Sequence, residues 1–238
     1  MKSAIVMGVG PDRGLGAQLC KRLAAHGLHV LVAGRTQAKL DAVVAGIVAS
    51  GASAQAVVAD AASEADTLAL FSSTANPIDV AIYNAGNNTP GRIVDMDAAY
   101  FEQSWRVGCY GGFLFGREAI RRMLPNGTGT LVFTGASASL RGRANFGAFN
   151  SAKGALRNLA QAMSKEYGAE GIHVGHVIVD GPIGGEKIMK NRPDIATKLG
   201  EEGMISIEGI VDAYEYLYRQ PRRAWSFELD VRTSIENW

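Results

Sequence analysis

The sequence lacks several features that would place a protein in a specialised structural class. Its 238 residues contain only two cysteines, Cys20 and Cys109, which cannot build a disulfide framework and are expected to be free thiols in a reducing compartment. No cluster of cysteines and histidines has the spacing of a zinc site. His173 and His176 lie in an alternating, strand-like run that points them to opposite faces, so no metal is expected there.

Neither an excess of charge nor a long apolar run is present. Lys and Arg number 24 and Asp and Glu 23, so the formal net charge is +1, which argues against a strongly basic nucleic-acid-binding protein. Arg117, Arg121 and Arg122 lie at helical spacing, which indicates a solvated helix face. Glycines stop the short apolar run 4–7 at once, so no signal peptide is expected. No run approaches the roughly 18 residues of a membrane span, and a cytoplasmic location is expected.

The sequence does have a regular alternation of short apolar runs and longer helical ones. Hydrophobic residues make up 47%, enough for one sizeable core, and the length suits one domain over residues 1–238. Strands are expected at 4–7, 29–33, 54–59, 80–83, 130–134, 172–179 and 226–231. Helices are expected at 15–26, 37–50, 63–73, 151–167 and 206–219, and over 97–124 with interruptions at Gly108, Gly111 and Gly112. This pattern predicts a doubly wound α/β fold, a parallel sheet between two helix layers.

One segment, from Gly181 to Gly203, departs from this alternation. It contains two prolines, several glycines and charges of both signs, and it lies between the sixth and seventh expected strands. A connection of this length is uncommon in a compact domain unless it has a function. Residues 181–205 are therefore predicted to form a substrate loop or lid.

The first strand-to-helix turn is rich in glycine, with the sequence Met-Gly-Val-Gly-Pro-Asp-Arg-Gly-Leu-Gly over residues 7–16. Glycines let the backbone approach a pyrophosphate, and the helix N-terminus provides N–H donors and the positive end of its dipole. The turn follows a strand and opens an amphipathic helix, so it predicts a dinucleotide site. Its expected cofactor-binding residues are Gly8, Gly10, Arg13, Gly14, Leu15 and Gly16. Either Gly8 or Gly10 is the first glycine of the motif.

The end of the second expected strand carries a cation where a carboxylate would bind the ribose diol of NAD. The residues there are Val-Ala-Gly-Arg-Thr over 32–36. Arg35 can pair with a 2′-phosphate, and Arg13 of the glycine turn can supply a second contact. Two cations and no carboxylate predict NADP(H) as the cofactor. The alternative is that Arg35 is a solvated residue at the start of the next helix.

These features resemble the short-chain dehydrogenase/reductase family over nearly the whole chain. Asn84-Ala85-Gly86 after the fourth strand is among the family's more specific signatures, and the matching residues occur in the family's order. The resemblance implies a Rossmann-like fold, NADP(H)-dependent oxidoreduction of a small molecule, and assembly as a homodimer or homotetramer. In this family an aromatic tail such as 225–231 with Trp238 often supports such an assembly.

The resemblance also implies roles for individual residues. The cofactor-binding positions that it adds are Asp60, Ala61, Asn84, Ala85, Gly86, Lys153, Gly181 and Ile183. Asp60 matches the residue that holds the adenine amine. Lys153 matches the lysine that hydrogen-bonds the nicotinamide ribose and lowers the pKa of the family's catalytic tyrosine. Ser137 lies close to the position of the substrate-orienting serine, with one residue fewer before the next matching position.

The main departures from the family concern the proton donor. The tyrosine expected four residues before Lys153 is Phe149, and the tyrosine that enoyl reductases place seven residues before it is Phe146. The helix asparagine that supports a proton-relay water is Gly108. Carbonyl reduction needs a hydride donor and a proton donor, and phenylalanine cannot donate a proton. The cofactor residues are therefore present, whereas the proton donor is missing or has moved.

Two residues are candidates to replace the missing phenol. Ser137 is the best-placed hydroxyl, and Asp180 ends the sixth strand, where burial could make it an acid. The alternative for Asp180 is an ordinary turn residue that caps backbone N–H groups. Together with Phe149 and Lys153, these two complete the predicted catalytic set. Cys109, Tyr110 and Tyr83 are expected to serve packing or subunit contact.

Three functional hypotheses follow, and they belong to different classes. The first is an NADP(H)-dependent oxidoreductase with altered proton-donor machinery that reduces an activated carbonyl, an enone or an imine, since such acceptors need less acid help. The second is a catalytically impaired, cofactor-binding pseudoenzyme that acts as an NADP(H) sensor or subunit scaffold. A lyase or isomerase is a third alternative. Retention of Lys153 favours catalysis or, at least, cofactor binding.

Overall fold

The computed structural model describes residues 1–86 and 88–236. Within these residues a seven-stranded, all-parallel sheet has the order β3-β2-β1-β4-β5-β6-β7. The strands are β1 (Ser3–Met7), β2 (His29–Gly34), β3 (Ala54–Val58), β4 (Ile78–Tyr83), β5 (Gly129–Thr134), β6 (Ile172–Asp180) and β7 (Glu228–Arg232). The strand order reverses between β1 and β4, where open α/β sheets form a crevice at the carboxyl ends of their strands.

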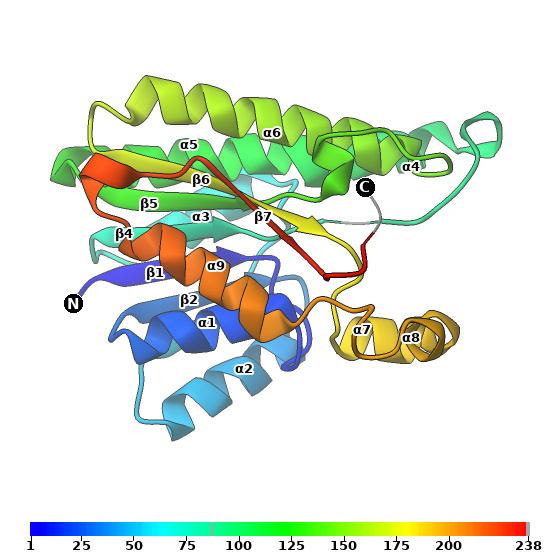
Figure 1. Ribbon diagram of the computed structural model, residues 1–238. Helices are drawn as coiled ribbons and strands as arrows, with labels where there is room; N and C mark the ends of the chain where they lie inside the picture. The colour runs from blue at the N-terminus through cyan, green and yellow to red at the C-terminus, as the bar shows by residue number, and fades with distance from the viewer. Residues whose placement is uncertain (87, 237–238) are drawn as a thin grey trace.

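Helices cover both faces of the sheet (Figure 1). They are α1 (Leu15–Ala25), α2 (Gln37–Ala49), α3 (Glu64–Ser72), α4 (Ala98–Trp105), α5 (Gly111–Met123), α6 (Gly147–Tyr167), α7 (Glu186–Asn191), α8 (Pro193–Leu199) and α9 (Ile207–Arg219). One apolar core joins α1, α2 and α9 to the side chains of Ala4 and Val6 in β1. The opposite core joins α3, α5 and α6 to Ile5 and Met7 of the same strand.

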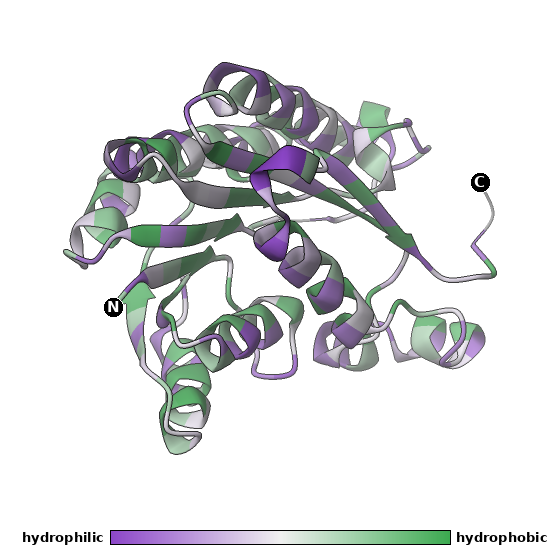
Figure 2. Ribbon diagram, turned by 60° about the vertical axis from the view of Figure 1, so that its left-hand side comes forward, coloured by the Kyte–Doolittle hydropathy of each residue, from purple (hydrophilic) through white to green (hydrophobic). Residues whose placement is uncertain are grey.

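This arrangement follows from the apolar character of both faces of the strands. Alternate residues of a strand point to opposite faces, so β1 contributes to two cores only because all five of its residues are buried. Figure 2 shows the surrounding helices alternating between hydrophilic and hydrophobic segments, as expected where one face of each helix contacts the sheet. The predicted doubly wound fold is confirmed. None of the helices in the described residues is long and apolar enough to cross a membrane.

The helical stretch 97–124 differs from the expectation, because its glycines do not break it. A π-helical segment, Arg106–Tyr110, joins α4 to α5 without a gap. A Cβ on Gly108 would lie 2.7 Å from the Cβ of Ala152. A Cβ on Gly111 would lie closer still to the Tyr83 hydroxyl oxygen, and one on Gly112 would lie closer still to a Leu156 methyl carbon. These glycines allow neighbouring elements to approach closely, which tertiary packing alone decides. Helix α6 also begins four residues earlier than predicted, at Gly147.

The segment 181–205 is closed at its base and contains two short helices, α7 and α8. Ile183 forms a bridge with Ile205, and the Ile205 amide donates to the Pro182 carbonyl at 2.8 Å. Figure 1 shows α7 and α8 beyond the end of the sheet. A Cβ on Gly185 would lie 3.3 Å from the Arg13 carbonyl oxygen, so α7 begins beside the glycine turn. Its role as a substrate lid stays a prediction.

The aromatic residues before β7 pack inside the chain. Trp225 stacks on His173 with 4.8 Å between ring centroids, and Phe227 stacks on His176 at 6.3 Å. These contacts serve the fold of this chain, whereas Trp238, the last residue of the predicted subunit contact, lies outside the described residues. His173 bonds the Ser226 carbonyl, whereas His176 contacts Glu228, which Arg157 of α6 holds, so the two histidines have separate partners.

Candidate active site

The turn after β1 depends on glycine at one position in particular. Gly8 has φ +95°, and a Cβ there would lie 2.5 Å from the Ala85 nitrogen, so a side chain fits neither the backbone nor the space. The Gly8 and Val9 amides both donate to the Ala33 carbonyl, at 3.0 and 2.9 Å. At Gly10, by contrast, a Cβ would meet nothing within 4 Å. Gly8 therefore makes the tight turn at the strand end, and Gly10 lies in the open part of the loop.

The N-terminus of α1 has the features of an anion site. The N-cap residue of α1 is Gly14, which has no side chain that could accept a capping hydrogen bond. The first N–H groups of the helix therefore have no acceptor from the N-cap residue. A Cβ on Gly16 would lie 3.1 Å from the Gly8 carbonyl oxygen, so the start of α1 lies directly against the glycine turn. Leu15, the first residue of α1, is buried in the core. Unpaired N–H groups at a helix N-terminus favour a phosphate.

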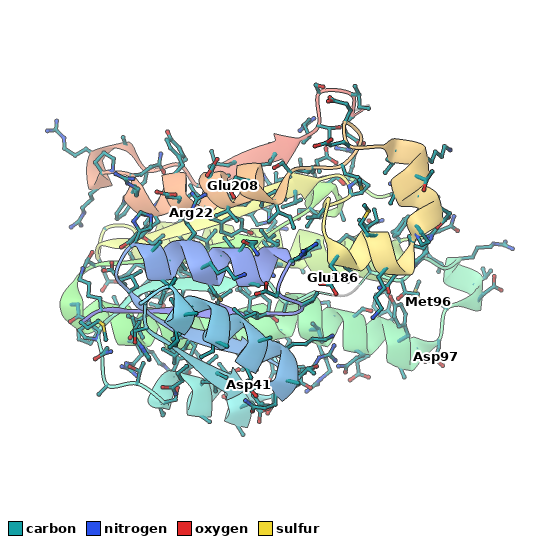
Figure 3. All side chains as sticks on the ribbon, turned by 90° about the horizontal axis from the view of Figure 1, so that it is seen from below. Arg22, Asp41, Met96, Asp97, Glu186 and Glu208 are labelled. Atoms are coloured by element: carbon teal, nitrogen blue, oxygen red, sulfur yellow. The ribbon has the colours of Figure 1, made fainter. Side chains whose placement is uncertain are left out.

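Two exposed cations flank this turn. Arg13 and Arg35 have no ion-pair partner among the residues that the structure describes, whereas the neighbouring Asp12 pairs with Lys21 at 2.7 Å. The first carboxylate after β2 is Asp41, which lies on α2 (Figure 3). It accepts a hydrogen bond from the Gln37 side chain at 2.7 Å. No carboxylate therefore occupies the end of β2. Both guanidinium groups are available to an anionic ligand.

Asp60 and Ala61 follow β3 and form a local turn. One Asp60 carboxylate oxygen accepts from the Ala62 amide at 2.9 Å, and the Asp60 amide donates to Asp66 at 2.8 Å. Ala61 is buried against the α5 start, where its carbonyl crowds Gly111. These bonds orient the Asp60 carboxylate at the same edge of the sheet as the glycine turn, as the predicted adenine contact requires.

The turn after β4 meets the glycine turn directly. The Asn84 amide nitrogen donates to the Gly8 carbonyl at 3.3 Å, and its oxygen accepts from the Thr134 hydroxyl at 3.0 Å. Ala85 forms the other side of the Gly8 contact, and a Cβ on Gly86 would lie 3.6 Å from the Lys153 nitrogen. The predicted residues of β1, β4 and α6 therefore come together at one place.

Lys153 is the buried cation at the centre of this edge. It is 4% exposed, and its ammonium donates to the Thr134 carbonyl at 2.6 Å. Burial penalises the charged form and lowers the pKa of Lys153 to about 8. The ammonium lies 5.9 Å from the centroid of the Phe149 ring, one helical turn earlier in α6. A phenyl ring thus stands beside the lysine, and it offers no proton.

Gly108 leaves no room for the family's helix asparagine. Its contact with Ala152, the neighbour of Lys153, brings the π-helical segment directly against α6. Tyr83 donates its hydroxyl proton to the Val107 carbonyl in the same segment and is fully buried, as predicted for a strand residue. A larger side chain at Gly108 would therefore require the π-helical segment or α6 to move. The close packing of these two elements thus explains why residue 108 is glycine.

Ser137 and Asp180 have different surroundings. Ser137 opens a short 3-10 turn and makes no side-chain hydrogen bond to the described residues, whereas the nearby Ser139 accepts from the Ala136 amide. Asp180 is 2% exposed, and both its oxygens accept from Arg141, at 3.2 and 3.1 Å. Arg232 lies 3.8 Å away. Asp180 therefore forms an ion pair with Arg141 that anchors the loop after β5 to the end of β6. Its catalytic role stays a prediction.

Several residues of this edge were not singled out by the sequence. They are Thr134, Arg141, Tyr214 and Arg232. Thr134 belongs to a strand that was predicted, but its hydroxyl and carbonyl partners come from three other elements. Each of these contacts joins residues far apart in the chain, and no local pattern marks them.

The chain is similar in sequence to known dehydrogenases. The family model described as short chain dehydrogenase matches residues 2–193. Gluconate 5-dehydrogenase of Gluconobacter oxydans is 27% identical over 177 residues, which cover 73% of this chain and 69% of that protein. Galactitol 2-dehydrogenase (L-tagatose-forming) of Cereibacter sphaeroides is 30% identical over 193 residues, 77% of this chain and 72% of that protein.

A solved structure extends the likeness to the whole fold. The crystal structure of a short-chain dehydrogenase from Rhodopseudomonas palustris has 35% sequence identity and a TM-score of 0.84, and the match covers 97% of this chain and 98% of that one. The glycine turn, the Asn84 turn and Lys153 meet at the edge where this fold binds dinucleotides. The chain belongs to the short-chain dehydrogenase/reductase family of oxidoreductases.

Proposed function

We propose that this protein is an NADP(H)-dependent oxidoreductase that reduces an activated carbonyl, an enone or an imine-type small molecule. The observation that carries the proposal is the pairing of a complete dinucleotide cradle with a phenyl ring beside the buried lysine. The first feature supports hydride transfer, and the second favours acceptors that need little help from an acid. The dehydrogenases named above support the general class of reaction and leave the acceptor to be found.

The residues of the cradle fit the cofactor in size and charge. Gly8 and Gly16 let the turn pack tightly on the backbone around it, whereas the space that a Cβ would enter at Gly10 is open. A pyrophosphate can therefore approach the backbone at the N-terminus of α1. Arg13 and Arg35 would hold the 2′-phosphate, and Asp60 would hold the adenine amine. Gly181 and Ile183, at the start of the lid, would close over the nicotinamide end.

The chemistry at the reaction centre follows from Lys153, Phe149 and Ser137. When bound, the cofactor supplies the hydride. Lys153 would hold the nicotinamide ribose, and its positive charge would stabilise negative charge that develops on the acceptor. Phe149 provides an apolar wall, and Ser137 orients the acceptor through its unpaired hydroxyl. An iminium acceptor is already positive, and its reduction needs no proton at the step of hydride transfer.

A second candidate function is a cofactor-binding pseudoenzyme. It is favoured by Phe149 and by Gly108, whose contact with Ala152 excludes the relay asparagine without movement of the backbone. In this role the protein would sense NADP(H) or support a partner subunit. The lid and Lys153 would then serve binding alone.

One experiment on the purified protein distinguishes these functions. NADPH and NADH are titrated by fluorescence, and bound NADPH is then tested in single turnovers against ketones, enones, quinones and cyclic imines. Tight NADPH binding with oxidation by one acceptor class is the expected result. Tight binding without oxidation by any class would favour the pseudoenzyme. Failure to bind either cofactor would overturn both functions.

Assembly and location complete the proposal. A homodimer or homotetramer is proposed from the family resemblance, and size-exclusion chromatography with light scattering tests it. Apolar side chains on α4 and α5, namely Phe101, Trp105 and Phe113, are more exposed than core residues and support such a contact. Cys20 and Cys109 are both free and buried, which supports a reducing, cytoplasmic location.

A further inference from the structure

A chain of three hydrogen bonds, of which the first is buried and the other two are partly buried, connects α9 to the glycine turn. The Tyr214 hydroxyl lies 2.6 Å from the Thr134 hydroxyl, which donates to the Asn84 side-chain oxygen at 3.0 Å. The Asn84 amide then donates to the Gly8 carbonyl at 3.3 Å. Tyr214 is 80 residues from Thr134 and belongs to none of the motifs of the cofactor site.

The direction of each bond in this chain is determined by its donors. A threonine hydroxyl has one proton, and Thr134 gives it to Asn84, so the Tyr214 hydroxyl must donate to Thr134. Burial raises the pKa of Tyr214 well above its usual range, so this hydroxyl stays protonated. Because the Asn84 side-chain oxygen accepts from Thr134, its side-chain nitrogen points to the Gly8 carbonyl. Tyr214 therefore stands at the donor end of the chain.

Thr134 also connects this chain to the reaction centre. Its carbonyl accepts from the Lys153 ammonium at 2.6 Å, whereas its hydroxyl contacts Asn84 and Tyr214. A shift of Thr134 would therefore move the partner of Lys153 and the partner of Asn84 together. Buried polar networks of this kind rigidify a site when every member is satisfied.

Helix α9, which carries Tyr214, is attached to α1 by ion pairs and to the core by its apolar face. Arg22 of α1 forms ion pairs with Glu208, Asp212 and Glu215 along α9, and Figure 3 shows Arg22 beside Glu208. Tyr214 is 2% exposed on the buried face of α9. Its ring packs in the apolar core, and only its hydroxyl reaches a polar partner.

We propose that Tyr214 is a positioning residue for the cofactor site, which acts through Thr134 to fix the Asn84 side chain against the glycine turn. The inference rests on the proposed cofactor-binding function. It predicts that the tyrosine hydroxyl contributes to dinucleotide affinity although it lies outside the cradle. The effect applies to NADPH and NADH alike, because the chain ends at the turn and not at the 2′-phosphate contacts.

The same helix provides a matched control. Tyr218, one turn further along α9, donates its hydroxyl proton to Asp79 at 2.8 Å. Asp79 lies at the start of β4, whereas Asn84 follows the end of the same strand. Tyr218→Phe therefore removes a hydroxyl from the same helix and leaves the cofactor edge unchanged.

The test compares binding and stability in the full-length chain. We expect Tyr214→Phe to raise the Kd for both NADPH and NADH about 3- to 10-fold, the effect of one lost hydrogen bond. Tyr218→Phe should leave both Kd values unchanged, and each variant should lose a few degrees in melting temperature. In a Thr134→Val background Tyr214→Phe should have no further effect on Kd, whereas in a Thr134→Ser background, which keeps the hydroxyl, its effect should persist.

The outcomes separate this inference from the proposed function. Tight binding by the wild-type chain with an unchanged Kd in Tyr214→Phe would overturn the positioning role alone. Equal increases in Kd for Tyr214→Phe and Tyr218→Phe would also overturn it, because they would show a general loss of stability. Absence of binding by the wild-type chain would overturn the proposed function, and this inference with it.

Discussion

Two regions of the same sheet edge differ in how closely their residues match those expected of the family. The predicted cofactor region, formed by the turns after β1, β2, β3 and β4, contains the glycine turn, Asn84 and two arginines without an ion-pair partner in the described part of the chain. The reaction region, formed by the turns after β5 and β6 and the start of α6, has Phe149 beside Lys153 and Asp180 in an ion pair with Arg141. The two regions therefore differ in how many of the residues expected of the family they contain.

The physical difference between the regions lies in what their functions require. The cofactor region depends on backbone shape, and at Gly8 a single added Cβ would meet the Ala85 backbone. The reaction region depends on individual side-chain atoms, such as one phenolic oxygen, which a substitution can remove while the ring and its packing remain. Three predictions test this division, in order of expected effect.

The largest effect is expected from returning the phenol to the reaction region. Phe149→Tyr should raise the single-turnover rate with reactive ketones about 100-fold, the lower end for a positioned proton donor, because the relay asparagine is still absent. Phe146→Tyr is the comparison variant, because it returns a phenol at the position that matches the enoyl-reductase tyrosine. It should give no gain with ketones, since Phe146 lies before α6 with its ring centroid 5.3 Å from the Arg143 guanidinium carbon. No gain on any ketone with Phe149→Tyr would contradict the placement of Phe149 at the reacting centre.

A smaller effect is expected from reversing a charge in the cofactor region. Arg35→Asp should raise the Kd for NADPH about 30-fold, since a charge-assisted hydrogen bond is worth about 2 kcal/mol, and should change the Kd for NADH little. Fluorescence titrations with both cofactors measure this. Lys165→Asp, an equal charge change in the last turn of α6, is the control for net charge. Equal losses for both cofactors would reject the 2′-phosphate contact.

The smallest effect concerns Lys153, which belongs to both regions. Its pKa is lowered from 10.5 to about 8, so the unfolded chain binds more protons than the folded chain between these values. The cost of burying the charge is therefore full below pH 8 and is relieved as pH rises. That cost is about 3 kcal/mol, offset in part by the hydrogen bond to Thr134.

The corresponding variant is Lys153→Met, which keeps the length of the side chain. Without cofactor it should be about 2 kcal/mol more stable than the wild type at pH 7, and this advantage should disappear near pH 10. Urea unfolding of both proteins at the two pH values measures the difference. A stability difference that stays constant from pH 7 to pH 10 would contradict the role of the buried charge.

The comparison also shows how far the sequence could predict the site. The strands were predictable because their residues are apolar on both faces, and the spacing between Phe149 and Lys153 was readable because both lie on one helix. The helix start at Gly147 and the π-helical segment are not predictable in this way, because glycine by itself is a weak helix former and only packing decides whether a helix continues through it. In the folded chain the glycines at 108, 111 and 112 are contact points, a role set by neighbours from other elements.

The sequence by itself determined the α/β fold, the glycine turn, the arginines after β1 and β2, and the presence of phenylalanine four residues before Lys153, since these depend on residue type and local spacing. Tertiary structure decided the rest. It showed that Gly8 makes the tight turn because Ala85 lies against it, and that Asp180 is paired because Arg141 reaches it. It also joined Tyr214 to Thr134 and lowered the pKa of Lys153. Burial and long-range hydrogen bonds exist only once distant segments have packed together.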